Sequence, residues 1–92
     1  MTSINFSNDV LKFMRSLETK PARQVYEKTI SLIVDPRPAA STELKGFKGY
    51  LRLRVGDFRV VYRIVADSIE VVLVDSRSDD EVYRHLERMR LA

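Results

Sequence analysis

The sequence predicts an α+β domain, in which a small, mainly antiparallel sheet carries a helical hairpin on one face and is followed by a last helix. Three observations predict this class. Apolar residues recur at helical spacing in the first third of the chain, whereas they alternate with polar residues between about positions 49 and 75. The alternating runs are joined by short turn signals, which is typical of antiparallel strands. A chain of 92 residues is expected to form a single domain, 1–92.

The N-terminal third predicts a strand followed by two helices. Ser3–Phe6 alternates in polarity and is expected to form the first strand. Ser7 is a favourable N-cap for a helix over residues 8–18, whose apolar side chains share one face. Pro21 suits the first turn of a second helix, which we expect to reach about Val34. The short link between these helices predicts a helical hairpin.

A long connection, residues 35–48, leads from the second helix into the sheet, and its two prolines cannot continue a helix. Three strands are expected at about 49–55, 58–65 and 69–75, separated by turns at Gly56–Asp57 and Asp67–Ser68. Ser78 and Glu81 fit a capping box that opens a last helix over about 79–90. The predicted order is therefore β-α-α-β-β-β-α.

The two strands around Gly56–Asp57 have one apolar and one basic face. A two-residue turn places Val55 opposite Phe58, and this fixes the pairing along both strands. The apolar face, expected to pack on the helices, holds Leu51, Leu53, Val55, Phe58, Val60 and Tyr62. The other, open face holds Tyr50, Arg52, Arg54, Arg59, Val61 and Arg63. Four aromatic residues are expected in the core: Phe6, Phe13, Tyr26 and Phe58.

Positive charge is concentrated in the same part of the chain. Between positions 45 and 63 the only anion is Asp57, and the cations are Lys45, Lys48, Arg52, Arg54, Arg59 and Arg63. An arginine cluster binds phosphate through bidentate hydrogen bonds and stacks on bases, so nucleic acid is the favoured partner. An acidic protein segment and an ordinary solvated face are the alternatives.

The composition also excludes several classes of function. The chain has no cysteine, so it has no disulfide or thiolate site, which fits a reducing cytoplasm. Neither a signal peptide nor a membrane span is expected. His85 is the only histidine, which excludes a two-histidine ribonuclease and argues against a zinc site. We therefore expect no metal, no cofactor and no membrane partner, and His85 receives no chemical role at this level.

Several stretches together resemble the RelE/ParE superfamily of bacterial toxins. They are the Leu44–Gly46 lead-in, the segment GYLRLRVGDFRVVYRI, a further strand, and Arg77 placed six residues before Tyr83 in a closing helix. With the two N-terminal helices and the DPRP connection, the resemblance covers nearly the whole chain. The order and spacing of these features, more than any one motif, carry it. The chain is most similar to the RelE branch, the ribosome-dependent messenger-RNA interferases of type II toxin–antitoxin modules.

This resemblance implies an endoribonuclease that needs no metal, cleaves messenger RNA in the ribosomal A site and so inhibits protein synthesis. Positions matching the family's catalytic set are Arg52, Arg59, Arg77 and Tyr83, with the arginines stabilising a phosphorane and Tyr83 handling a proton. Positions expected to bind RNA are Arg54, Arg63, Tyr50, Lys45 and Lys48. The implied partners are messenger RNA, the ribosome and a small acidic, RelB-like antitoxin.

Two alternatives stay open at this level. RelE-type sites often carry lysines on the strand, whereas this chain has Tyr50 and Arg52 there, and arginine is a poor base. The ParE branch shares the fold, lacks the catalytic set and inhibits DNA gyrase. A ParE-like non-catalytic toxin and an inactive relative therefore also fit the sequence.

Overall fold

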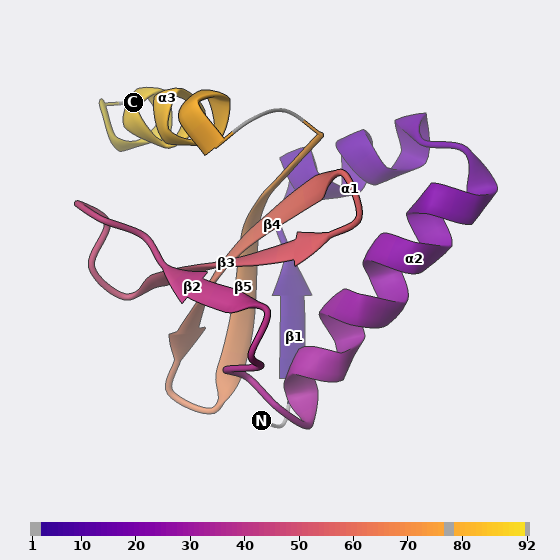
Figure 1. Ribbon diagram of the computed structural model, residues 1–92, viewed down its shortest axis with the longest axis horizontal. Coiled ribbons are helices and arrows are strands. Elements are labelled where there is room, and N and C mark those ends of the chain that lie inside the picture. The colour runs from indigo at the N-terminus through magenta and orange to yellow at the C-terminus, as the bar shows by residue number, and fades with distance from the viewer. Residues whose placement is uncertain (1–2, 77–78, 92) are drawn as a thin grey trace.

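The computed structural model describes residues 3–76 and 79–91. In this part of the chain a five-stranded sheet, with strand order β1-β5-β4-β3-β2, lies between two helices on one side and a third helix on the other (Figure 1). The elements are β1 (Ser3–Phe6), α1 (Asn8–Ser16), α2 (Thr19–Ile30), the 3₁₀ turn η1 (Ser31–Ile33), β2 (Ser41–Glu43), β3 (Tyr50–Val55), β4 (Phe58–Val65), β5 (Ser68–Asp75) and α3 (Asp79–Leu91). The predicted α+β class is confirmed, and among the strands of residues 3–76 only β1 runs parallel to its neighbour.

The β3–β4 hairpin has the register predicted from its turn. Val55 pairs with Phe58, Arg54 with Arg59, and the pairing continues to Tyr50 opposite Arg63. Gly56 has φ +58°, which only glycine adopts without strain at the first position of a type II′ turn. The turn therefore sets which side chains share a face of the sheet.

The structure corrects the predicted elements at four places. The predicted connection 35–48 contains a further strand, β2, which pairs antiparallel with β3. Its sequence, Ser-Thr-Glu, has no alternation of apolar and polar residues and so gave no strand signal. As an edge strand, β2 is held by its backbone pairing with β3. The turn between β4 and β5 lies at Ala66–Asp67, one residue earlier than predicted. Both N-terminal helices end earlier than predicted, at Ser16 and Ile30, and η1 extends the second by one tight turn.

The main core lies between the sheet and the helical hairpin. Its buried residues include Val10 from α1, Val25 from α2, and the alternate residues of β3 and β4 that were predicted to face the helices. Phe6, Phe13 and Phe58 pack against this core as predicted. Tyr26, which was predicted in the core, is instead 51% exposed, and its ring stacks on that of Phe6 with the ring centroids 6.1 Å apart.

The opposite face of the sheet is only partly open, which corrects the prediction of an open face. A second cluster forms there from the 44–47 loop, two strand residues and α3: Leu44, Phe47, Val61, Leu73, Val82 and Leu86. An extra residue in β5, at the irregularity near Val72, interrupts the strand alternation at this point. Helix α3 therefore covers the middle of the face, and the arginines lie around its margin. No helix in the described residues is long and apolar enough to cross a membrane.

Candidate nucleic-acid interface

The turn end of the β3–β4 hairpin brings two arginines directly opposite one another. Arg54 is exposed, and its partner Arg59 is half-buried between Arg54 on β3 and Asp75 on β5. The guanidinium of Arg59 also donates a hydrogen bond of 2.9 Å to the backbone carbonyl of Asp57. Arg59 is thus held in place by the turn, while Arg54 extends into solvent beside it. Two neighbouring cations of this kind form a favourable phosphate site.

The other end of the hairpin combines a cation with an aromatic ring. The Arg63 guanidinium lies over the Tyr50 ring, 5.6 Å from its centroid, within the range of a cation–π contact. Arg63 also has Glu70 of β5 opposite it, so the arginine face is not purely basic. Arg52, half-buried between Thr42 and Val61, lies between the two ends. The structure therefore places the four strand arginines on one face, here called the arginine face.

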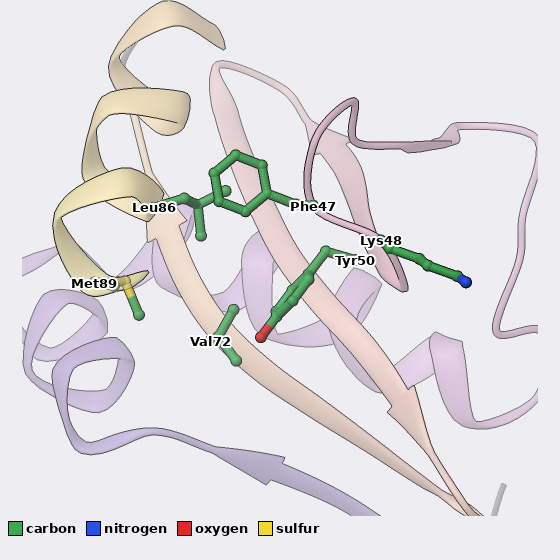
Figure 2. Close-up of a pocket in the computed structure, with 6 residues that line it drawn as sticks. All are labelled: Phe47, Lys48, Tyr50, Val72, Leu86 and Met89. Carbon is green, nitrogen blue, oxygen red and sulfur yellow. The ribbon is translucent and has the colours of Figure 1, made fainter. Parts of the chain in front are cut away.

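The loop between β2 and β3 supplies the two predicted lysines. Leu44 and Phe47 anchor this loop in the second core, while Lys45 and Lys48 are exposed. Beside it lies a pocket of about 300 Å³, lined by Phe47, Lys48, Tyr50, Val72, Leu86 and Met89. Figure 2 shows the rings of Phe47 and Tyr50 on one side, α3 on the other, and the Lys48 ammonium extending away. The lysines are therefore positioned at the rim of the face, not within it.

Tyr83 lies against the same loop. Its hydroxyl oxygen accepts a hydrogen bond of 3.1 Å from the backbone N–H of Lys45, and its ring lies 5.9 Å from that of Phe47. In this arrangement the tyrosine joins α3 to the loop. Arg77, the other predicted catalytic residue of this region, lies outside the described residues.

His85 is a polar residue of this region for which the sequence indicated no role. Its Nδ1 lies 3.8 Å from Oδ2 of Asp75, a buried carboxylate that is paired in register with Arg59. The two residues stand ten positions apart on different elements, so no local motif signals their contact. In the described residues, no cluster of three or more histidine, aspartate or glutamate side chains could hold a metal ion.

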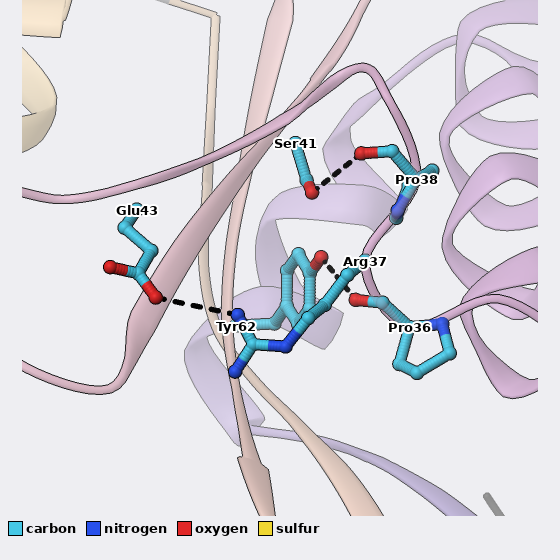
Figure 3. Close-up of polar contacts among 6 residues, drawn as sticks. All are labelled: Pro36, Arg37, Pro38, Ser41, Glu43 and Tyr62. Atoms are coloured by element: carbon cyan, nitrogen blue, oxygen red, sulfur yellow. Dashed lines mark hydrogen bonds and ion pairs between the residues drawn. The ribbon is translucent and has the colours of Figure 1, made fainter.

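The buried Tyr62 holds the connection between α2 and β2 against the face of the sheet that packs on α1 and α2. The hydroxyl of Tyr62 donates a hydrogen bond of 2.7 Å to the carbonyl oxygen of Pro36, and Ser41 donates one of 2.8 Å to Pro38 (Figure 3). Burial raises the pKa of Tyr62 above its ordinary value of 10.0, although Ser41 and Arg37 act in the opposite direction. These contacts position β2, and thereby Thr42 beside Arg52.

Comparison with known proteins agrees with this architecture. Residues 4–81 match the family model of the ParE toxin of type II toxin–antitoxin systems. A chain of Escherichia coli that is named as a RelE-like toxin protein is 33% identical over 92 residues, covering 95% of this chain and 96% of its own.

Solved structures give the same result for the fold. The archaeal RelE of the RelE–RelB complex from Pyrococcus horikoshii superposes with a TM-score of 0.73 at 24% identity, over 84% of this chain and 96% of that one. A free variant of E. coli RelE, with two arginines replaced by alanine, gives 0.70 at 26% identity over 88% of each chain.

The fold and the matched residues define a toxin of a type II toxin–antitoxin system. The chain belongs to the ParE toxin family, within the RelE/ParE superfamily. The resemblance inferred from the sequence is thereby confirmed.

Proposed function

We propose that this toxin is a ribosome-dependent endoribonuclease that cleaves messenger RNA during translation and so stops protein synthesis. The observation that carries the proposal is the arginine face, on which Arg54 and Arg59 stand opposite one another with Arg52 and Arg63 beside them. Like charges placed opposite each other in a sheet destabilise it, and a bound phosphate would offset that cost. The 33% identical relative with a RelE-like name supports the nuclease branch.

In the proposed reaction the 2′ oxygen of a ribose attacks the adjacent phosphate. Charge develops on the non-bridging oxygens, and Arg52 and Arg59 stabilise it through charge-assisted hydrogen bonds. Arg77 and Tyr83 complete the proposed catalytic set, with Tyr83 handling a proton after its contact with Lys45 opens. RNA on either side of the cut is held by Arg54, Arg63 and Tyr50 and by the rim lysines, Lys45 and Lys48.

Primer extension on a translated message tests this proposal. Inducing the wild type should produce cuts within the coding region, and a transcript without a start codon should stay intact. Arg59→Gln and Arg77→Ala should each abolish most cutting, whereas Arg23→Gln, which removes an exposed charge from α2 on the other side of the sheet, should cut like the wild type. Intact messages in growth-arrested wild-type cells, or equal cutting by Arg59→Gln, would refute the proposal.

The second candidate is a ParE-like inhibitor of DNA gyrase, and the ParE name of the matching family model favours it. This reading requires binding alone and predicts growth arrest with messages intact and a DNA-damage response. A supercoiling assay with purified gyrase distinguishes the two, because the nuclease reading predicts full gyrase activity. A chain that arrests no growth at all would instead be an inactive relative.

We also propose a small acidic antitoxin as the cognate partner. Structures similar to this chain include RelE–RelB complexes, and a basic face of this kind suits an acidic segment folding across it. If the neighbouring gene encodes a small acidic protein, its co-expression with this chain should restore growth. Continued arrest, with both proteins present at equal levels, would contradict this pairing.

A further inference from the structure

The pocket beside the loop between β2 and β3 adjoins the arginine face. Tyr50 and Val72 line it from the sheet, Phe47 lines it from the loop, and Leu86 lines it from α3. Tyr50 also stands opposite Arg63 in the β3–β4 hairpin, so it belongs to the pocket and to the face at once. This residue therefore connects the pocket directly to the proposed RNA surface.

The chemistry of the lining suits a small, flat ligand. The rings of Phe47 and Tyr50 are perpendicular, with their centroids 6.5 Å apart. Two rings at this angle can hold a flat ligand by a face contact with one and an edge contact with the other. Among the six lining residues, only the Tyr50 hydroxyl and the Lys48 ammonium are polar side-chain groups. The volume of about 300 Å³ is at the lower end of the range for ligand sites.

Positive charge lies around the pocket and not inside it. The Lys48 side chain extends away from the apolar lining into solvent, and Lys45 is exposed on the same loop (Figure 2). The Arg63 guanidinium lies over the Tyr50 ring, and Glu70, opposite Arg63 on β5, offsets part of its charge. The ligand that fits this distribution has a flat apolar part and an anionic group attached beside it. A nucleotide within a single strand has this form.

Met89 provides an adaptable side of the pocket. It lies on α3, across the pocket from the rings of Phe47 and Tyr50 (Figure 2), and it is 40% exposed. A methionine side chain is flexible and polarisable, and it packs well against the edges of aromatic rings. Met89 can therefore adjust to a ring that enters the pocket without disturbing the buried Leu86.

We propose that this pocket binds one unstacked purine base of single-stranded RNA, with the neighbouring phosphates held by Lys48 and Arg63. The inference deepens the RNA-binding part of the function proposed above and rests on it. The base stacks on Tyr50 and contacts Met89 on the other side. Because the lining offers few hydrogen-bonding groups, the pocket selects by stacking area. It favours two-ring bases over one-ring bases and distinguishes adenine poorly from guanine.

Fluorescence anisotropy with two minimal strands tests this pocket. One strand has about eight positions, all of them abasic sugar units without a 2′-hydroxyl, and the other carries a single 2′-fluoroadenosine at its centre. Neither strand can be cut by attack of a 2′ oxygen, so binding is measured independently of nuclease activity. The wild type should bind the adenine strand about 5- to 150-fold more tightly than the abasic strand, the range for one stacked base. Uracil in place of adenine should give a smaller ratio.

Variants of the lining separate the base contact from the phosphate contacts. Tyr50→Leu should remove most of the affinity ratio, whereas Tyr50→Phe, which keeps the ring, should retain it. Met89→Ala should also lower the ratio. Lys48→Gln should weaken both strands alike and leave the ratio unchanged. Leu11→Ala is the matched control for Met89→Ala, because it also shortens an exposed apolar side chain of a helix, on the other side of the sheet, and it should keep the wild-type ratio.

The outcomes distinguish this inference from the function on which it rests. Equal wild-type affinity for the two strands would refute base binding. A ratio lost in Tyr50→Leu and unchanged in Met89→Ala would place the base on Tyr50 outside the pocket, and would equally refute the proposal. Unchanged ratios in both variants, with rescue by the antitoxin lost, would assign the pocket to the antitoxin instead. The expected ratios in a chain that cuts no message in primer extension would support the pocket and refute only the nuclease function.

Discussion

Arg54 and Arg59 are directly paired across the β3–β4 hairpin, next to its turn. Two cations at opposed positions repel each other and lower the stability of the hairpin. Arg59 donates a hydrogen bond to the Asp57 carbonyl and has the carboxylate residue Asp75 opposite it on β5, whereas Arg54 is exposed. The pair thus combines a local cost in stability with the proposed anion-binding role, and the two properties can be separated by mutation.

Replacing Arg54 by glutamate should stabilise the chain and weaken RNA binding. An opposite-charge pair across the strands should raise the free energy of unfolding by about 0.2–1 kcal/mol. The same change removes a phosphate contact, so affinity for a short single-stranded RNA should fall, and its dependence on salt should become less steep. Urea denaturation and fluorescence anisotropy measure the two effects. A variant that binds RNA as tightly as the wild type would remove Arg54 from the interface.

Tyr83→Phe removes only the hydroxyl that accepts a hydrogen bond from the Lys45 backbone N–H. The ring should still pack on Phe47, so the loss of stability should be modest, about 0.5–1.5 kcal/mol. The amide of Lys45 should exchange with deuterium faster, while amides in the middle of β4 keep their protection. Unchanged protection at Lys45 would show that Tyr83 does not hold the loop in solution.

Losing the hydrogen bond from Tyr62 to Pro36 should lower the stability of the chain more than the Tyr83→Phe change does, because Tyr62 is buried. Tyr62→Phe leaves the Pro36 carbonyl without this donor and should cost about 1–3 kcal/mol in urea denaturation. Ser41→Ala removes the neighbouring bond to Pro38, which is only partly buried, and should cost less. Equal losses in the two variants would contradict the special position of Tyr62.

Tyr62 also predicts how stability depends on pH. Its pKa in the folded chain is raised by burial, so the folded state holds the phenolic proton more tightly than the unfolded state. The stabilisation is therefore fully present below the ordinary value of 10.0 and is lost as pH rises through the raised value. The urea concentration at the midpoint of unfolding should fall when the pH is raised from about 8 to above 10, and it should fall less in Tyr62→Phe than in the wild type. Equal falls would contradict the raised pKa.

Ala66 is the one described non-glycine residue with a positive φ, at 53°. An L-residue in this left-handed region costs about 1–2 kcal/mol, and glycine avoids that cost at the expense of entropy in the unfolded chain. Ala66→Gly should therefore raise the free energy of unfolding by about 0.5–1 kcal/mol. Ala22→Gly, the same chemical change inside α2, should lower it by about 1 kcal/mol. A loss of stability at both positions would contradict the turn geometry.

Most of the fold could be predicted from the sequence, and so could the common face of the strand arginines. Period-two alternation, with the Gly56–Asp57 turn, was enough to derive the register from Tyr50 to Arg63, because a sheet with one buried face admits one register. The same argument placed the four strand arginines on a common face. Helical periodicity and proline positions located the helices to within a few residues.

What lies on that face depends on packing between elements that are far apart in the chain. Strand β2 forms because an edge pairs through its backbone, which needs no side-chain pattern. Helix α3 covers the centre of the face because Val82 and Leu86 bury themselves on Val61 and Leu73, and the position of α3 then places Tyr83 against the 44–47 loop. The contact of His85 with Asp75 likewise depends on where α3 docks. Side chains brought together by the packing of separate elements leave no periodic signal in the chain, and for this reason the sequence could not reveal them.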